Sequence, residues 1–403
     1  MIFTTRSTRK GIETLARLIE HLQHLSPDLE AESRVDFISE NVDLSNLISV
    51  RALSRRLRRT VPKLDGIILN AGLGGWTGID WPRAIWGVVT DLVHQVSWPS
   101  YKLGQIGVLN PPQVASSLSK EEGTGEEEEE PRLGAIFCAN VFGHYMLAHN
   151  VVPLLKASSS SPANGPARII WVSSLEATIS LFDINDIQGL RTDAPYESSK
   201  ALTDVLALTS NLPSTAPWVN SFYSTEEDEG GKDTTITTTP SSPNVYLSHP
   251  GICGTGILPL SLPFFYLMLA SFWMARFLGS PWHTLSTYLG ASAPVWLALS
   301  SQAELDEAES MYVRHGGGRA KWGSSSDRLG RGQLASTEVD GWGYGGVVGY
   351  PVVQADRLRR RKRGAHDLEA DEKLRFEELG RQSWRQMEEL RVQWDGILDR
   401  AGV

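Results

Sequence analysis

The sequence contains little cysteine and no excess of basic residues, and each shortage excludes a class of protein. Its two cysteines, Cys138 and Cys253, are too few for a disulfide framework, which favours a reducing compartment over a small secreted fold. The 38 basic residues are outnumbered by 47 acidic ones, and the formal net charge of the 403 residues is -9. Because nucleic acids are bound by clustered Lys and Arg, we do not expect nucleic acid as the main partner. The opening MIFTTRSTRKG turns basic early and does not read as a cleavable signal peptide.

Strand-like runs alternate with helix-like segments along most of the chain. We expect strands at residues 1–7, 35–45, 64–72, 167–177 and 244–251, with helices between them. Strands separated by helices predict right-handed crossovers and a parallel sheet with both faces covered, a doubly wound α/β fold. Such sheets bind their ligands at the carboxyl ends of the strands.

The pattern divides into a sheet domain over residues 1–300 and an extension over 301–403. Two low-complexity segments, an acidic one at 116–131 and a Ser/Thr-rich one at 224–243, are expected to be surface inserts because neither composition can form a core. The extension begins with a Gly- and Trp-rich segment and ends in a helical tail. The tail carries one apolar stripe, made of Trp384, Met387, Leu390, Trp394 and Ile397. We expect this stripe to pack on the sheet domain or on a partner.

Tyr196 and Lys200 lie one helical turn apart in the sequence PYESSK. A phenol has a pKa of about 10, so it needs a stabilised anion to act as a general acid or base near neutral pH. An ammonium one turn along can supply that charge, although a surface Tyr/Lys pair without function has the same spacing. Ser173 and Ser174 end a predicted strand, and Asn140 lies on the preceding helix. Together these groups suit the protonation of an oxygen while hydride reaches its carbon.

These residues resemble the short-chain dehydrogenase/reductase family from residue 1 to about residue 300. The resemblance is carried by NAG at 70–72, by Asn140, by the strand-end serine, by Tyr196 with Lys200, and by PGICGT at 250–255. It implies a Rossmann-like fold in which Tyr196 donates the proton, Lys200 lowers its pKa and touches the nicotinamide ribose, and Asn140 holds a water in the proton relay. The family normally uses the second of two terminal serines, which favours Ser174, with Ser173 as the alternative.

The choice of cofactor can be argued from the segment TTRSTRK. An acidic residue normally holds the ribose hydroxyls at this place, whereas a guanidinium can bind the 2′-phosphate of NADP. The segment has no acidic residue, so NADP is expected; an exposed basic turn is the alternative. The resemblance implies that NADPH is bound by Arg6, Arg9, Asp43, Asn70, Ala71, Gly72, Tyr196, Lys200, Pro250, Gly251 and Thr255.

A narrower resemblance covers nearly the whole chain. The segments WVSSLEA, DINDIQGL, PYESSKALTDVLAL, MYVRHGGGRAKWGSSSDRLG and TEVDGWG are similar to those of the 3-keto-steroid reductases of sterol C4-demethylation, a fungal group within the family. This resemblance implies NADPH-dependent reduction of a sterol 3-ketone to the 3β-alcohol on the cytosolic face of the endoplasmic reticulum membrane or on lipid droplets. It also implies other sterol C4-demethylation enzymes as partners. A catalytically impaired scaffold of those enzymes is the alternative function.

One departure from the family concerns the amino end. Members carry an earlier strand and a T-G-x-x-x-G-x-G turn that receives the pyrophosphate at a helix N-terminus, and this sequence starts at the second strand. Either the sequence lacks its natural beginning or the protein has lost the turn. We therefore expect the chain as given to bind NADPH weakly.

Residues 257–275, ILPLSLPFFYLMLASFWMA, carry no charge and approach the ~20 residues that cross a bilayer core. Pro259 and Pro263 weaken the case for a straight span. In the family the segment after the Pro-Gly turn covers the substrate, so we expect an apolar lid half-immersed in a membrane, through which a sterol passes from lipid to the site. A true span and a buried soluble lid are the alternatives.

Overall fold

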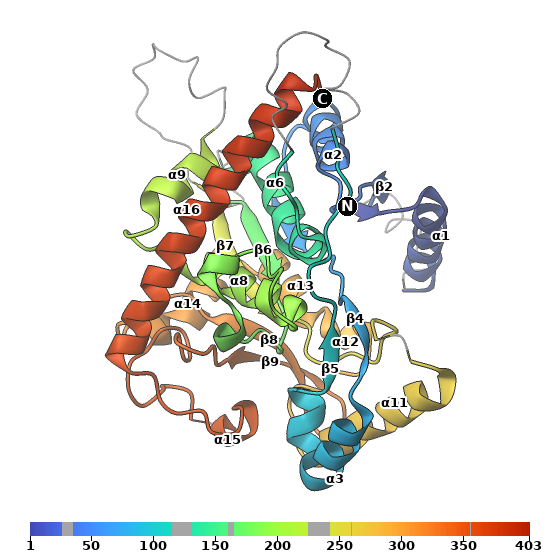
Figure 1. The fold of residues 1–403 in the computed structure, drawn as a ribbon, viewed down its shortest axis with the longest axis vertical. Helices are drawn as coiled ribbons and strands as arrows, with labels where there is room; N and C mark the ends of the chain where they lie inside the picture. Colours follow the sequence, from blue (N-terminus) through green and yellow to red (C-terminus); the bar gives the residue numbers. More distant parts are fainter. Residues whose placement is uncertain (26–34, 115–129, 160–164, 225–241, 259, 355) are drawn as a thin grey trace.

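The computed structural model describes most of the chain, namely residues 1–25, 35–114, 130–159, 165–224, 242–258, 260–354 and 356–403. The low-complexity segments predicted at 116–131 and 224–243 lie almost entirely outside these residues. The amino end and the carboxyl end both belong to described segments (Figure 1).

The main sheet has five strands in the order β3-β6-β7-β8-β9. They are β3 (Gly66–Leu69), β6 (Arg168–Val172), β7 (Asn244–His249), β8 (Lys321–Ser326) and β9 (Gly332–Thr337). The first four are parallel and β9 runs antiparallel to β8. All five residues of β6 are buried, as expected for a strand covered on both faces. The predicted α/β fold with a parallel sheet is confirmed.

Two hydrophobic clusters cover opposite faces of this sheet. Ile169 and Trp171 of β6 belong to the larger cluster, whereas Ile170 between them belongs to the smaller one. Successive side chains of a strand point to opposite faces, so the RIIWV run supplies both clusters.

The helices that surround the sheet are α2 (Leu47–Thr60), α5 (Ala135–Phe137), a π-helical turn η1 (Cys138–Phe142), α6 (Gly143–Asn150), α7 (Val152–Ser159), η2 (Ile179–Leu181), η3 (Ile184–Asp186), α8 (Pro195–Thr209), α9 (Ala216–Tyr223), α12 (Thr287–Gly290), α13 (Ser292–Leu299), α14 (Gln302–Val313) and α15 (Arg357–Arg360).

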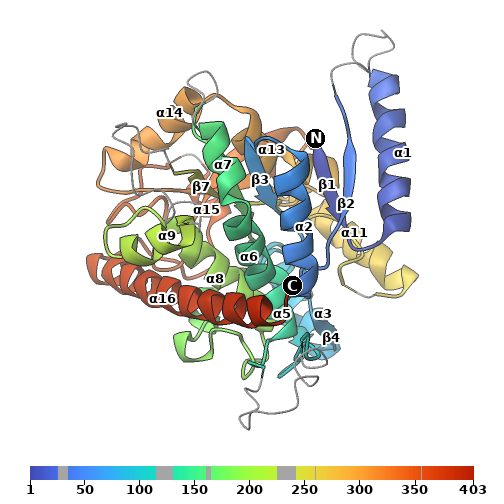
Figure 2. The ribbon, with the colours of Figure 1, turned by 90° about the horizontal axis from the view of Figure 1, so that it is seen from above.

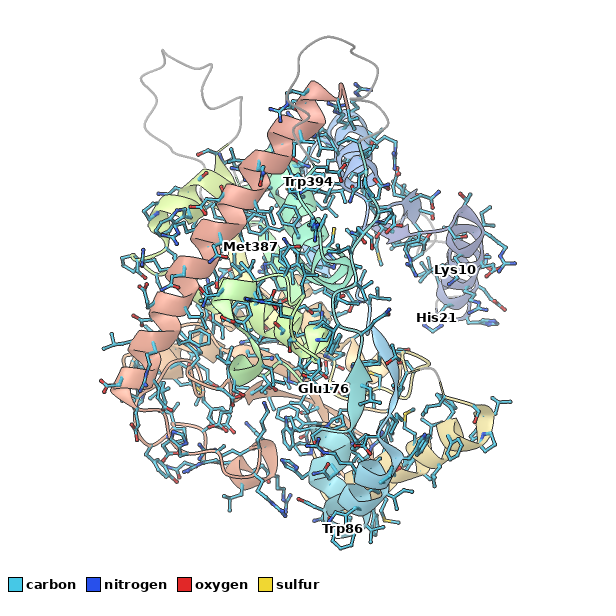
Figure 3. The ribbon with its side chains drawn as sticks, viewed as in Figure 1. Lys10, His21, Trp86, Glu176, Met387 and Trp394 are labelled. Carbon is cyan, nitrogen blue, oxygen red and sulfur yellow. The ribbon has the colours of Figure 1, made fainter. Side chains whose placement is uncertain are left out.

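The tail forms one long helix, α16 (Ala370–Arg400), which crosses α8 and α9 (Figure 1). Trp384, Met387 and Trp394 of the predicted stripe are buried there, and Figure 3 labels the last two. The crossing is close, because a Cβ on Gly380 would lie 2.5 Å from the Thr209 side chain. Helix α16 therefore covers the outer face of α8, the helix that carries Tyr196.

A separate two-stranded parallel sheet contains the amino end. It consists of β1 (Ile2–Thr5) and β2 (Ile38–Asn41), paired in register from Ile2 opposite Ile38. Figure 2 shows this small sheet with α1 (Thr8–Leu25) on its outer side. Among the described strands, β1 pairs only with β2 and β3 pairs only with β6.

An excursion between β3 and α5 builds the lower end of the molecule in Figure 1. It is an antiparallel hairpin of β4 (Trp76–Ile79) and β5 (Lys102–Gly104) with α3 (Trp81–Ser97) inserted between its strands. The apolar segment predicted at 257–275 contributes α11 (Leu262–Phe277), which contacts α3. Within the described ranges, none of the helices has the length and apolarity that crossing a bilayer would require.

Candidate active site

Tyr196 and Lys200 lie on the first two turns of α8, which starts at Pro195. Proline suits the first position of a helix, because its fixed backbone angle is helical and no N–H is lost from the ladder. Tyr196 is 8% exposed and Lys200 is 4% exposed. The Lys200 ammonium donates a hydrogen bond of 2.9 Å to the Val172 carbonyl at the end of β6. The pair therefore lies inside the protein, at the carboxyl edge of the sheet.

Asn140 connects the 70–72 loop to α8. It lies in the π-helical turn η1, an irregularity that is frequent at functional sites. Its side-chain oxygen accepts from the Leu73 N–H at 2.6 Å, and its amide nitrogen donates to the Leu73 carbonyl and to Ser199 Oγ, both at 3.0 Å. Asn140 thus fixes the loop that follows β3 against the helix that carries Lys200.

The same loop passes close to Lys200. A Cβ built on Gly72 would lie 3.3 Å from Asn140 Oδ1 and 3.8 Å from Lys200 Nζ. His144 Nε2 hydrogen-bonds the Ala71 carbonyl at 2.8 Å. Glycine at this position keeps free space beside the Lys200 ammonium, where the resemblance placed the nicotinamide ribose. The residues at this edge fit the cofactor in that respect.

The two strand-end serines have different surroundings. The Ser174 side chain lies beside the Tyr196 phenol, where it opposes the rise in the phenol pKa. Ser173 is 3% exposed, and its hydroxyl donates to the Lys200 carbonyl at 3.3 Å, inside the α8 backbone. The geometry therefore favours Ser174 as the hydroxyl beside the phenol and makes Ser173 a contact between strand and helix.

Burial controls the protonation of Tyr196 and Lys200. It raises the pKa of the Tyr196 phenol, and the nearby negative charge of Glu176 adds to this effect. It lowers the pKa of the Lys200 ammonium to about 8, with the Asp204 carboxylate opposing the shift. The described residues alone therefore do not lower the phenol pKa as the resemblance implied. They leave Tyr196 protonated at neutral pH, which is the state that a proton donor needs.

An apolar cavity of about 630 Å³ opens above Tyr196. Ser173, Ser174 and Tyr196 are among its lining residues, and apolar side chains of α3 and α11 form much of its wall. Its size falls within the range of cavities that hold small molecules. Pro250, Gly251 and Thr255 from the predicted cofactor set also line this cavity.

Three residues at the polar end of the cavity were not anticipated from the sequence. Trp76 lies against Tyr196 with 4.7 Å between ring centroids, and the Lys102 ammonium lies 3.6 Å from the centre of the Trp76 ring. Lys102 pairs with Glu176, which Figure 3 labels in the middle of this region. Trp76 and Lys102 come from the hairpin, whose short strands show no periodic sequence pattern, so their place in the site could not be predicted. Glu176 could have been found, because it lies two residues beyond Ser174 at the end of a predicted strand.

The predicted adenosine end of the cofactor site lies on the small sheet. Arg6 follows β1 and is exposed, without an ion-pair partner among the described residues, whereas Arg9 lies 3.6 Å from Glu13. Asp43 follows β2 and accepts from the Ser45 N–H at 2.9 Å. Figure 3 shows Lys10 on the neighbouring α1, outside the group around Glu176. The structure thus forms two groups, one around Lys200 and one around Arg6.

The sequence is 65% identical over 406 residues to a 3-keto-steroid reductase of Aspergillus fumigatus, a match that covers 100% of this chain and 87% of the relative. The chain belongs to the 3-keto-steroid reductase family. A second member, from Gibberella zeae, is 35% identical over 99% of this chain and 87% of its own length. No family model matches the sequence.

Membership makes the protein an oxidoreductase and confirms the narrower resemblance found in the sequence. Solved structures are more distant. A 7α-hydroxysteroid dehydrogenase complexed with NADH and 7-oxo-glycochenodeoxycholic acid is 14% identical, with a TM-score of 0.37 over 74% of this chain and 76% of that one, a likeness too weak to carry an argument about the site.

Proposed function

We propose that the protein reduces the 3-ketone of a sterol to the 3β-alcohol, with NADPH as the reductant, in ergosterol-type sterol biosynthesis. The observation that carries the proposal is the presence of the buried Tyr196 phenol and the neighbouring Ser174 hydroxyl in the lining of a mainly apolar cavity. A sterol has one polar end and a large apolar body, so its ketone matches the polar end and its rings match the walls. The names of the relatives support the same substrate.

The residues at this end suggest how the reaction proceeds. The ketone oxygen accepts hydrogen bonds from the Tyr196 phenol and the Ser174 hydroxyl, and both bonds strengthen as negative charge grows on that oxygen. The bound dinucleotide supplies the hydride. Tyr196 then gives its proton to the oxygen, and the Lys200 ammonium stabilises the phenolate that remains. Asn140 fixes the adjoining loop and, as the resemblance implies, holds the water that returns a proton to Tyr196.

The function can be tested directly with the full chain. Because weak NADPH binding is expected, the cofactor is supplied at saturating concentration. We then expect a sterol 3-ketone in mixed micelles to be converted to its 3β-alcohol as NADPH is consumed, with the product identified by mass spectrometry against both 3-hydroxy epimers. A folded protein that binds the sterol but gives no alcohol with either NADPH or NADH would overturn the proposal and leave the scaffold function in its place.

Preference for NADPH is expected to depend on Arg6. Arg6→Ala should weaken NADPH binding by about ten- to a hundred-fold, the usual value of hydrogen bonds to a charged group, and leave NADH binding unchanged. Both dissociation constants can be measured by fluorescence titration. Arg17→Ala, which removes an equally exposed charge from α1, is the matched control. Equal losses for both cofactors in Arg6→Ala would show that no 2′-phosphate contact exists there.

The proposed site of action is the cytosolic face of the endoplasmic reticulum membrane, or a lipid droplet, among other enzymes of sterol C4-demethylation. Support comes from α11, where Leu262, Tyr266 and Phe277 are each at least 65% exposed. Its charged residue, Arg276, is buried and bonded to the His283 and Thr284 carbonyls. A helix with an apolar outer surface fits an interfacial position.

A further inference from the structure

The outer side of α3 exposes large apolar side chains to solvent instead of packing them against the rest of the protein. Ile85, Trp86 and Val89 are 62%, 73% and 77% exposed, and they lie on adjoining turns. Each such side chain is worth about 1.5–3 kcal/mol when it is removed from water. Figure 3 shows Trp86 at the outermost edge of the molecule, pointing away from the sheet.

This surface continues onto α11. The ring centroids of Trp81 on α3 and Phe264 on α11 are 4.5 Å apart, so the two helices are in contact. On the far side of that contact Trp273 and Phe277 are 58% and 69% exposed. We call the exposed apolar side chains of the two helices the platform, defined by Ile85, Trp86, Val89, Phe264, Trp273 and Phe277.

The cavity opens within the platform. The cavity is lined by Ile85 and Val89 of α3 and by Phe264, Leu267 and Met274 of α11, and all five are also at least 45% exposed. The same side chains therefore form the cavity wall and the outer surface. An apolar molecule that entered between the two helices would meet no polar rim at these residues.

A basic segment borders the platform. Arg363 forms an ion pair of 2.7 Å with Asp91 of α3, and its side chain is still 74% exposed. It ends the run RLRRRKR at 357–363, in which Leu358 is 87% exposed. An apolar surface bordered by the exposed Arg363 guanidinium, on a chain whose net charge is -9, matches a bilayer with anionic headgroups.

We propose that α3 is a second membrane-binding element, which docks beside α11 on an anionic bilayer so that the cavity opens into the lipid. The proposal extends the membrane position proposed above for α11. It assigns to Trp86 a place in the headgroup region and to Arg363 a contact with lipid phosphates. Its test requires no turnover of sterol.

The test uses the full chain and sedimentation with vesicles of phosphatidylcholine, with and without phosphatidylserine. Trp86→Ser on α3 and Phe277→Ser on α11 should each weaken binding to the mixed vesicles by about tenfold or more. Neither residue lines the cavity. Val392→Ser removes a side chain that is 57% exposed on α16 and should leave binding unchanged. Binding should also be stronger with phosphatidylserine and should weaken as salt is raised.

Two further measurements keep the inference separate from the proposed function. NADPH binding and the reduction of a water-soluble ketone should be unchanged in Trp86→Ser, so a loss confined to vesicles supports the platform even if the sterol is not the substrate. Light scattering reports self-association of the protein directly. The membrane role of α3 is wrong if Trp86→Ser binds vesicles as wild type does. Loss of a wild-type dimer in Trp86→Ser, with vesicle binding unchanged, would instead identify this surface as a contact between two copies of the chain.

Discussion

Tyr196→Phe is expected to lower the rate of ketone reduction by about 10²- to 10⁴-fold, the usual contribution of a positioned general acid. Phenylalanine keeps the ring that packs on Trp76 and removes only the hydroxyl beside Ser174. Binding of NADPH should stay near wild type, because the Lys200 bond to the Val172 carbonyl does not involve the phenol. Single-turnover kinetics and a fluorescence titration measure the two quantities separately.

Tyr101→Phe is the matched control for this substitution. Tyr101 lines the same cavity, and burial raises the pKa of its phenol to about 12. It lies on no helix with a lysine one turn along, so its removal should change the rate by only a few-fold. If both variants lost a comparable part of the rate of ketone reduction, the two phenols would act only through packing in the cavity. The assignment of Tyr196 as proton donor would then be rejected.

The local patterns of the sequence predicted those parts of the site that lie within one element. The spacing of Tyr196 and Lys200 requires only that α8 be a helix, and the buried run RIIWV requires only that β6 be a central strand. Chain order along a parallel sheet then places the end of β6, the 70–72 loop and the start of α8 at one edge. Asn140 reaches that edge for the same reason.

Features that depend on distant contacts could not be predicted. The choice between Ser173 and Ser174 depends on which hydroxyl bonds the α8 backbone and which lies beside the Tyr196 phenol, and a terminal Ser-Ser does not reveal this. The raised pKa of Tyr196 comes from burial, to which the hairpin that carries Trp76 contributes. The sequence of that hairpin has no periodic pattern from which it could be predicted. Strand β8 has the sequence KWGSSS, whose Gly and Ser residues have low strand propensity, so tertiary packing alone makes it a buried strand.

That unexpected strand also carries the ion pair beneath the site. Lys321 of β8 lies 2.5 Å from Asp204 Oδ2, and the two side chains are 2% and 1% exposed. The same ammonium donates to the Ser174 carbonyl at 2.7 Å. Asp204 is on α8, one turn beyond Lys200. Lys321 therefore connects β8, the catalytic helix and the strand end that positions the Ser174 hydroxyl.

Breaking this pair from either side should cost about 3–5 kcal/mol of unfolding free energy, because the remaining charge stays buried without its counter-ion. We expect Lys321→Met and Asp204→Leu each to shift the denaturant midpoint down with little change in slope, and the double variant to recover most of the loss, since two apolar side chains leave no charge to compensate. A double variant no more stable than the weaker single one would mean that the cost comes from cavities and overpacking rather than from charge. The recovery should not extend to catalysis. Without the Lys321 ammonium the Ser174 carbonyl keeps only the 3.3 Å hydrogen bond from the Ala177 N–H. The double variant should therefore fold well and still reduce ketone more slowly than wild type, with the defect in kcat rather than in NADPH binding.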